Sequence, residues 1–365
     1  MSSVWSSAGV KLSVFGESHG KGIGVVLDNI PAGQPIDYEK IKAFMARRAP
    51  GNDPTATARK EADEPEILSG IHNKKTTGAP ICAVIRNSDT HSSDYSQMET
   101  TARPGHADYT GYLRYKGFND VRGSGHFSGR LTAPLVFAGA VCGQIIERMG
   151  IYVGAHLYSI MDVIDKPMNT VSITRDDILS LREKAFPVLD DRAGEKMREQ
   201  ILAAKKNADS VGGIIECCAV GMPAGIGSPM FDGLENTIAS LIFGIPAVKG
   251  LEFGAGFGAT KMFGSQNNDE FYVSEDGTIL TETNYHGGIL GGISSGMPIS
   301  LKVALKPTSS IGVPQKTVNF VKLENQEIIV KGRHDPCVAV RAVPVVESCV
   351  NVALLSQLIE QTQLF

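Results

Sequence analysis

The segment from Leu131 to Met149 constrains the fold most strongly, because it is apolar on nearly every face. Pro134 is compatible with a helix here, since it falls in the first turn. A helix that is apolar all round has to be buried on all sides. We therefore expect this segment to be a helix enclosed between layers of other structure.

Short strands and helices are predicted on both sides of that segment. The helix after Asp37 has a capping residue followed by an apolar stripe of Ile41, Phe44 and Met45. The charged helices at 174–185 and 191–208 are expected to face solvent. Strands are predicted at 24–29, 81–86, 211–220 and 299–305, and further helices after Leu234 and at 345–359.

A repeated turn suggests an internal duplication. Pro31-Ala32-Gly33 follows the first of these strands and Pro223-Ala224-Gly225 follows the third, and a helix comes after each turn. Three shared residues are also compatible with chance. The chain contains no Pro/Ser-rich linker, which favours one domain over residues 1–365.

Composition excludes several functional classes. The net charge is −4, so bulk electrostatics give no case for nucleic-acid binding. The six cysteines form no C-x-x-C pair, which indicates free, buried thiols in a reducing compartment. The histidine spacings predict no metal site. We find no secretory signal and no apolar run long enough for a bilayer, so the expectation is a cytoplasmic protein without a membrane partner.

Five glycine-rich stretches carry unusual polar residues. The first, FGESHGKG at 15–22, contains G-x-S-x-G, the pattern of a hydrolase nucleophile elbow. Ser18 could then be a nucleophile, His19 could be the working group, or the stretch could be only a tight turn. An elbow requires a helix directly after the serine, whereas the residues that follow are typical of a strand.

The other four stretches lie at 103–109, 122–130, 286–296 with 306–310, and 331–337. Small residues and two arginines before the apolar helix form a good phosphate site by physical criteria, because backbone N–H groups at a helix start attract anions. Each stretch also has a plain structural interpretation: a surface turn, a mobile loop or a capping cluster.

Together these stretches resemble the chorismate synthase family, in the family's own order and over essentially the whole chain. The matching motifs are GESHG (16–20), RPGHADYT (103–110), S-G-R-x-T (128–132), HGGILGGISSG (286–296), KPTSS (306–310) and GRHDPCVAVRAVP (332–344). The resemblance implies an α+β fold: a β-α-β sandwich with central helices between antiparallel sheets, with internal pseudo-duplication, assembled as a homotetramer.

The resemblance also implies a reaction. The family converts 5-enolpyruvylshikimate 3-phosphate to chorismate by an anti-1,4-elimination of phosphate and a C6 proton, in the shikimate pathway of aromatic amino acid biosynthesis. It requires reduced FMN although no net oxidation occurs. Some members reduce their own flavin with NADPH. This chain has no dinucleotide fingerprint, which favours an external source of reduced flavin.

The implied catalytic residues are His19, as proton donor to the leaving phosphate, His106, as the group that protonates or tunes the flavin, and Asp335, as an aid to proton removal through flavin N5. The substrate has two carboxylates and a phosphate, so arginines are needed as bidentate clamps. The implied substrate residues are Ser18, Arg48, Arg103 and Arg130. The implied flavin residues are His126, Phe127, Ser128, Ala247, Gly291, Lys306, Pro307, Thr308, Ser309, Ser310 and Arg333.

Three positions depart from many family members. His126 stands where they have an FMN-contacting arginine, which implies a weaker or pH-dependent contact, or a contact through the backbone. Pro246 replaces an asparagine, and Pro54 replaces an arginine of a loop linked to nucleotide binding. A serine hydrolase and a non-catalytic flavin- or phosphate-binding module remain the alternative functions.

Overall fold

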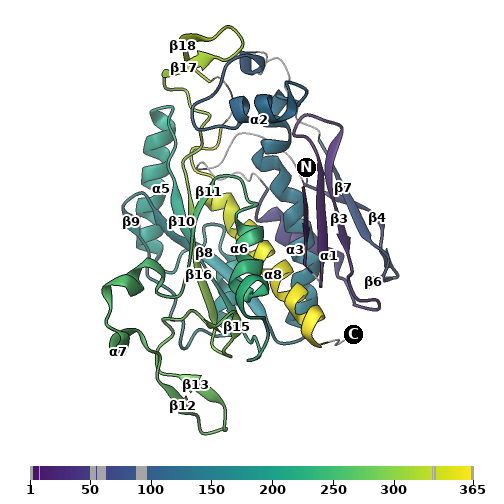
Figure 1. The fold of residues 1–365 in the computed structure, drawn as a ribbon, viewed down its shortest axis with the longest axis vertical. Helices are drawn as coiled ribbons and strands as arrows, with labels where there is room; N and C mark the ends of the chain where they lie inside the picture. Colours follow the sequence, from purple (N-terminus) through teal and green to yellow (C-terminus); the bar gives the residue numbers. More distant parts are fainter. Residues whose placement is uncertain are drawn as a thin grey trace.

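Two five-stranded antiparallel sheets enclose a layer of helices (Figure 1). The structure is a computed structural model that describes residues 3–7, 9–49, 55, 63–87, 97–330, 332 and 334–362. The first sheet has the order β1 (Val4–Ser6), β2 (Lys11–Gly16), β3 (Gly22–Asp28), β7 (Ile81–Arg86), β4 (Pro65–Ser69). The second has the order β9 (Val163–Ile164), β8 (Tyr152–Ile160), β10 (Gly213–Val220), β16 (Ile299–Leu305), β11 (Val248–Phe253).

The layer between the sheets is built on α3 (Thr132–Glu147) and α8 (Ala339–Thr362). Nearly every residue of α3 is buried, as the all-round apolar sequence predicts. The two helices cross closely at Gly139, where a Cβ atom would lie 2.3 Å from the Cα atom of Ser348. Only glycine allows this approach, so α3 and α8 pack almost backbone to backbone.

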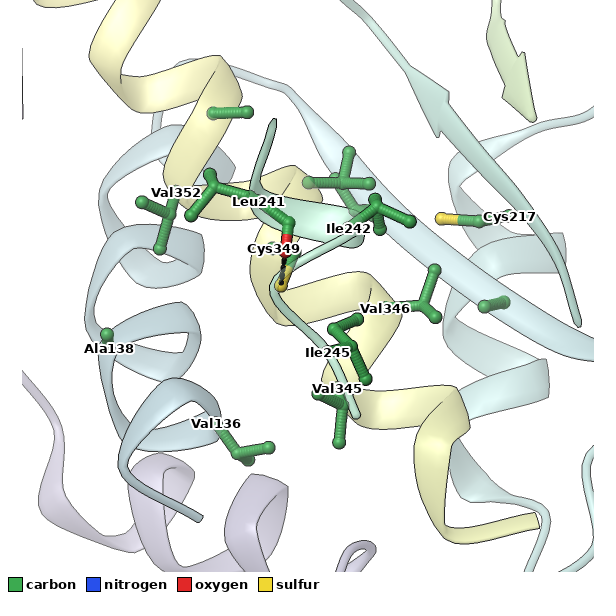
Figure 2. Packing of buried hydrophobic residues seen from close by; sticks show 14 of the residues in the cluster. Val136, Ala138, Cys217, Leu241, Ile242, Ile245, Val345, Val346, Cys349 and Val352 are labelled. Carbon is green, nitrogen blue, oxygen red and sulfur yellow. Dashed lines mark hydrogen bonds between the residues drawn. The ribbon is translucent and has the colours of Figure 1, made fainter. Parts of the chain in front are cut away.

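Two shorter helices complete this layer. The helix α1 (Tyr38–Ala46) packs on α3, and α6 (Leu234–Ile242) packs on α8. Figure 2 shows Leu241 and Ile242 of α6 against Val346 and Cys349 of α8, with the Cys349 thiol directed at the Leu241 carbonyl. One continuous cluster of buried apolar residues runs from Val10 to Leu358 and joins both sheets to the helices.

The predicted duplication is visible in the topology. In each half the chain forms two antiparallel strands, a Pro-Ala-Gly turn, a helix, two more strands and a long central helix. The spatial orders β2-β3-β7-β4 and β8-β10-β16-β11 correspond strand for strand, and α1 and α3 correspond to α6 and α8. Three shared turn residues were therefore a true sign of the repeat.

The two charged helices, α4 (Arg175–Glu183) and α5 (Asp191–Lys206), begin and end close to the predicted residues. Thr174 caps α4 with a reciprocal capping box to Asp177. Ile178 and Leu181 of α4 form a small apolar cluster with Cys218 of β10. These helices therefore expose one face to solvent and cover the outer face of the second sheet with the other, which explains why both Cys217 and Cys218 are buried.

The last helix is longer than predicted, because Pro344 lies inside α8 rather than before it. Ala342 already donates its backbone N–H to the Val338 carbonyl, so a helical turn precedes the proline. Contrary to the sequence expectation, residues 122–147 and Ala339–Gln361 are long and apolar enough to cross a bilayer. Both stretches are mostly buried inside the protein, which is the behaviour of core helices.

Several of the remaining elements project at the two ends of the molecule. Figure 1 shows α7, β12 and β13 projecting at one end and α2, β17 and β18 at the other. Their bounds are α2 (Asp108–Tyr115), α7 (Gly264–Asn267), β5 (Ile71–His72), β6 (Lys75–Thr76), β12 (Phe271–Val273), β13 (Ile279–Thr281), β14 (Ile289–Leu290), β15 (Ile293–Ser294), β17 (Gln315–Asn319) and β18 (Glu324–Ile328), with 3-10 helices η2 (Arg122–Phe127), η3 (Gly129–Leu131), η4 (Met230–Asp232) and η5 (Gly256–Lys261).

Candidate active site

A cavity of about 830 Å³ lies where both central helices begin. Residues 128–130 and Thr132 line it at the start of α3, and Val338 and Arg341 line it at the start of α8. The other walls come from 103–110, η2, 243–249 and 305–310. The unpaired N–H groups at the ends of two long helices give such a cavity a positive potential.

Basic side chains dominate this cavity. Among the described residues, the basic groups that line it are Arg48, Arg103, Arg130, Lys249, Lys306 and Arg341. The carboxylates that contact them belong to Asp63, Asp108 and Asp335. The positive groups outnumber the negative ones, so the cavity is suited to a polyanionic ligand.

One buried carboxylate joins two of these arginines. Asp63 accepts hydrogen bonds from the side chains of Arg48 and Arg130, and its own side chain is fully buried. Arg48 also donates to the Thr132 hydroxyl over 3.1 Å, and the Arg341 Nε donates to the Arg48 carbonyl over 3.0 Å. Burial and the neighbouring guanidinium groups lower the pKa of Arg48 to about 10, while the arginines lower the pKa of Asp63. The arrangement holds three guanidinium groups at one wall.

A second cluster forms the opposite wall. Arg103 donates to both carboxylate oxygens of Asp108 and, over 3.0 Å, to the hydroxyl of Ser310. His106 Nδ1 lies 2.8 Å from Asp108 Oδ1. Burial, Arg103 and Lys306 lower the pKa of His106, which favours the neutral imidazole.

His19 and Ser18 lie just behind the cavity wall. His19 is buried next to Gly123, a lining residue, and a Cβ atom on Gly123 would lie 2.0 Å from His19 Nδ1. The Ser18 hydroxyl is 3.3 Å from the same nitrogen. The turn after His19 leads into β3, so no helix follows Ser18. This geometry excludes a nucleophile elbow, which needs a helix at that point.

Nearly the whole chain is similar in sequence to proteins of one known family. A family model described as chorismate synthase matches residues 10–359.

The chain belongs to the chorismate synthase family.

It is 44% identical over 352 residues to the chorismate synthase of Thermococcus kodakarensis, with 96% of each chain covered. It is 45% identical over 350 residues to that of Pyrococcus abyssi, again with 96% of each covered. A solved structure described as "Crystal Structure of Chorismate Synthase" superimposes with a TM-score of 0.73 at 28% identity, covering 96% of this chain and 92% of that one. Chorismate synthases are lyases of the shikimate pathway, and this chain is therefore an enzyme of that class.

The cavity brings together most of the residues that the chorismate synthase resemblance implied. His106, Asp335, Arg48, Arg103, Arg130 and the proposed flavin residues His126, Phe127, Ser128, Ala247, Lys306, Pro307, Thr308, Ser309 and Ser310 all line it. Gly291 does not: it lies in the exposed turn between β14 and β15. Arg333 and Pro54 lie outside the described residues. The roles of all these residues stay predictions.

The departure at His126 has a structural explanation. His126 Nδ1 lies 2.8 Å from the carbonyl oxygen of Gly16, and Nε2 lies 2.5 Å from the hydroxyl of Ser3. Both ring nitrogens are therefore engaged by the N-terminal strands. Any contact of this residue with a ligand in the cavity is expected through its backbone or ring face. Pro246 also lines the cavity, next to Ala247.

Sequence reasoning missed several members of the site. Asp108 and Arg341 were both inside quoted motifs, but their importance depends on contacts with Arg103 and Asp335 that only folding reveals. Lys249 lies two positions from the predicted residue Ala247, and Ser124 lies two positions from the predicted residue His126. Asp63 had no local signal at all, because its partners are Arg48 and Arg130 from other segments.

Proposed function

We propose that this chain converts 5-enolpyruvylshikimate 3-phosphate to chorismate, by anti-1,4-elimination of phosphate and a C6 proton, with reduced FMN bound in the cavity. The observation that carries the proposal is the surplus of basic side chains over carboxylates around one large cavity, among the residues that the structure describes. The substrate has two carboxylates and one phosphate, and the cofactor has a further phosphate. Arg48 and Arg130 share one carboxylate, so an anionic ligand would balance the positive charge that Asp63 leaves over.

The residues at 306–310 fit a phosphate-bearing cofactor. The hydroxyl of Thr308 is buried at the cavity wall without a hydrogen-bond partner among the described residues. An orphaned buried hydroxyl is costly unless a ligand pairs with it. Lys306, Ser309 and Ser310 add a cation and two more hydroxyls at the same wall. When bound, reduced flavin supplies transient electron density to the reacting substrate.

The chain's own residues would bind the substrate and move its protons. Arg48 and Arg130 present a preorganised pair of guanidinium groups for carboxylate or phosphate. His19, next to the wall at Gly123, would hold the proton that goes to the leaving phosphate. Asp335, held by Arg341 over 2.7 Å, would assist removal of the C6 proton. His106 would protonate the bound flavin or tune its charge.

We also propose a single domain over residues 1–365 that assembles as a homotetramer in the cytoplasm and takes reduced flavin from an external source. Support for assembly comes from the projecting segment around α7, β12 and β13. It exposes large apolar side chains, notably Phe257, Phe263, Phe271 and Val273, which a lone chain would leave in water.

An anaerobic assay tests the proposal. Wild-type protein is mixed with 5-enolpyruvylshikimate 3-phosphate and dithionite-reduced FMN, and chorismate is followed by its absorbance. We expect chorismate and equimolar phosphate only when reduced FMN is present. A parallel arm with oxidised FMN and NADPH should give none, because the flavin source is external. FMN binding without chorismate in any arm would instead favour a non-catalytic flavin-binding protein.

A further inference from the structure

We propose that Asp108 is a positioning residue that keeps the proton of neutral His106 on Nδ1, so that Nε2 is the nitrogen that exchanges a proton in the cavity. The tautomer itself follows from the geometry of the protein alone. Its catalytic consequence rests on the proposed function, because only that function assigns His106 a proton to move.

The position of the proton follows from the chemistry of the two facing atoms. His106 Nδ1 and Asp108 Oδ1 are 2.8 Å apart. An ionised carboxylate can only accept hydrogen bonds. A bare Nδ1 lone pair at that distance would repel the carboxylate oxygen, so Nδ1 has to carry the hydrogen.

Among the described residues, Arg103 is the other group that faces Nδ1, and both hydrogens on its Nη2 nitrogen have acceptors elsewhere. Its Nη2 nitrogen lies 3.1 Å from His106 Nδ1 and 3.5 Å from Nε2, so it sits beside the ring. That nitrogen carries two hydrogens, and these have acceptors in Asp108 Oδ1 at 2.6 Å and the Ser124 hydroxyl at 3.1 Å. These hydrogens are therefore satisfied without Nδ1, and a tautomer that accepted one of them at Nδ1 would still place a bare lone pair against the Asp108 carboxylate.

Arg103 also keeps Asp108 ionised. Its Nε donates to Asp108 Oδ2 over 2.8 Å, and its backbone N–H donates to the same oxygen over 2.9 Å. These bonds hold the pKa of Asp108 well below its usual range despite burial. Asp108 is also the first residue of α2, which fixes its backbone.

Of His106 and Asp108, the imidazole is the one placed to act on a ligand directly. The side chain of His106 is 15% exposed and lines the cavity, whereas the side chain of Asp108 is 4% exposed and is not part of the lining. Asp108 therefore acts through His106. An acid that orients a histidine in this way, through the nitrogen not used in catalysis, is a general arrangement in proton-transfer sites.

The test is the ¹⁵N NMR spectrum of ligand-free protein, which reports the tautomer without any turnover. We expect wild-type His106 to be the Nδ1–H tautomer. In Asp108→Asn the amide oxygen should turn to Arg103 and the NH₂ group to His106, which forces the Nε2–H tautomer. We expect kcat to fall about a hundredfold or more while KM changes little.

The matched control is Asp269→Asn. Asp269 Oδ2 lies 2.5 Å from Nδ1 of His286, so the pair repeats the same contact outside the cavity. This variant should change the His286 signals and leave the His106 signals as in wild type. A wild-type Nε2–H tautomer would overturn the inference, as would an Asp108→Asn variant with unchanged tautomer and kcat. If the wild type shows Nδ1–H but forms no chorismate, the proposed function fails and the tautomer assignment stands.

Discussion

Single buried carboxylates determine the shape of this site at the scale of residues. Asp63 lies in a left-handed backbone conformation, with φ of 51°, and its side chain is enclosed by Arg48 and Arg130. Two like charges stay side by side at the cavity wall because this carboxylate lies between them. The substrate would then meet arginines that are already in place, which reduces the entropy lost on binding.

Replacing Asp63 should therefore make the protein less stable against unfolding. Asp63→Ala leaves two guanidinium groups buried without their counterion, and we expect the free energy of unfolding to fall by about 3–5 kcal/mol. Urea denaturation measures it. The control is Glu66→Ala, which removes the exposed partner of Arg86 at 3.0 Å and should change the free energy by less than about 1 kcal/mol. Equal effects of the two substitutions would contradict this account.

At the scale of elements, hydrophobic periodicity and capping residues predicted most of the main helices and strands. Asp37 caps α1 by accepting the Glu39 N–H, and Ile41 and Met45 are buried as the stripe required. The start of α8 could not be predicted, because a proline inside a helix is normally read as its boundary. Packing on α3 and α6 compensates for the backbone hydrogen bond that Pro344 cannot make.

The close crossing of α3 and α8 yields a graded prediction. Gly139→Ala would place a methyl group against the backbone of Ser348, which cannot move away easily. Alanine favours a helix by about 1 kcal/mol, yet we expect a net loss of about 1–3 kcal/mol in the free energy of unfolding.

Gly143→Ala should lower the free energy of unfolding by less than Gly139→Ala. A Cβ atom on Gly143 would lie 2.8 Å from the end of the Asn351 side chain, which can move aside more easily than backbone. Thermal and urea unfolding of both variants provide the comparison. If Gly139→Ala were at least as stable as Gly143→Ala, the two helices would not be in the close contact described above.

At the scale of the whole molecule, the internal duplication determines where the cavity forms. Each half contributes one long central helix, and the cavity forms where both helices begin. The sequence predicted the motifs that line this cavity and the layered fold around them. It could not predict which residues meet, because pairs such as Arg103 and Ser310, or Arg48 and Arg341, are far apart in the chain. Gly291 shows the same limit of prediction from sequence. Its motif was expected at the flavin site, but the residue lies in the turn between β14 and β15 and does not line the cavity.

The central claim is that flavin and substrate share this one cavity, and filling it tests that claim most directly. Gly129 lines the cavity, and a Cβ atom there meets nothing within 4 Å, so Gly129→Trp can project into the space without disturbing the wall. Leu202→Trp is the control, because Leu202 is exposed on α5, outside the cavity and away from the segment proposed for assembly.

The measurement is equilibrium binding of FMN by fluorescence, with and without 5-enolpyruvylshikimate 3-phosphate, on both variants after circular dichroism has verified their fold. We predict that Gly129→Trp loses FMN binding and chorismate formation at least a hundredfold, whereas Leu202→Trp matches the wild type. A folded Gly129→Trp protein that binds FMN and forms chorismate like the wild type would contradict the account.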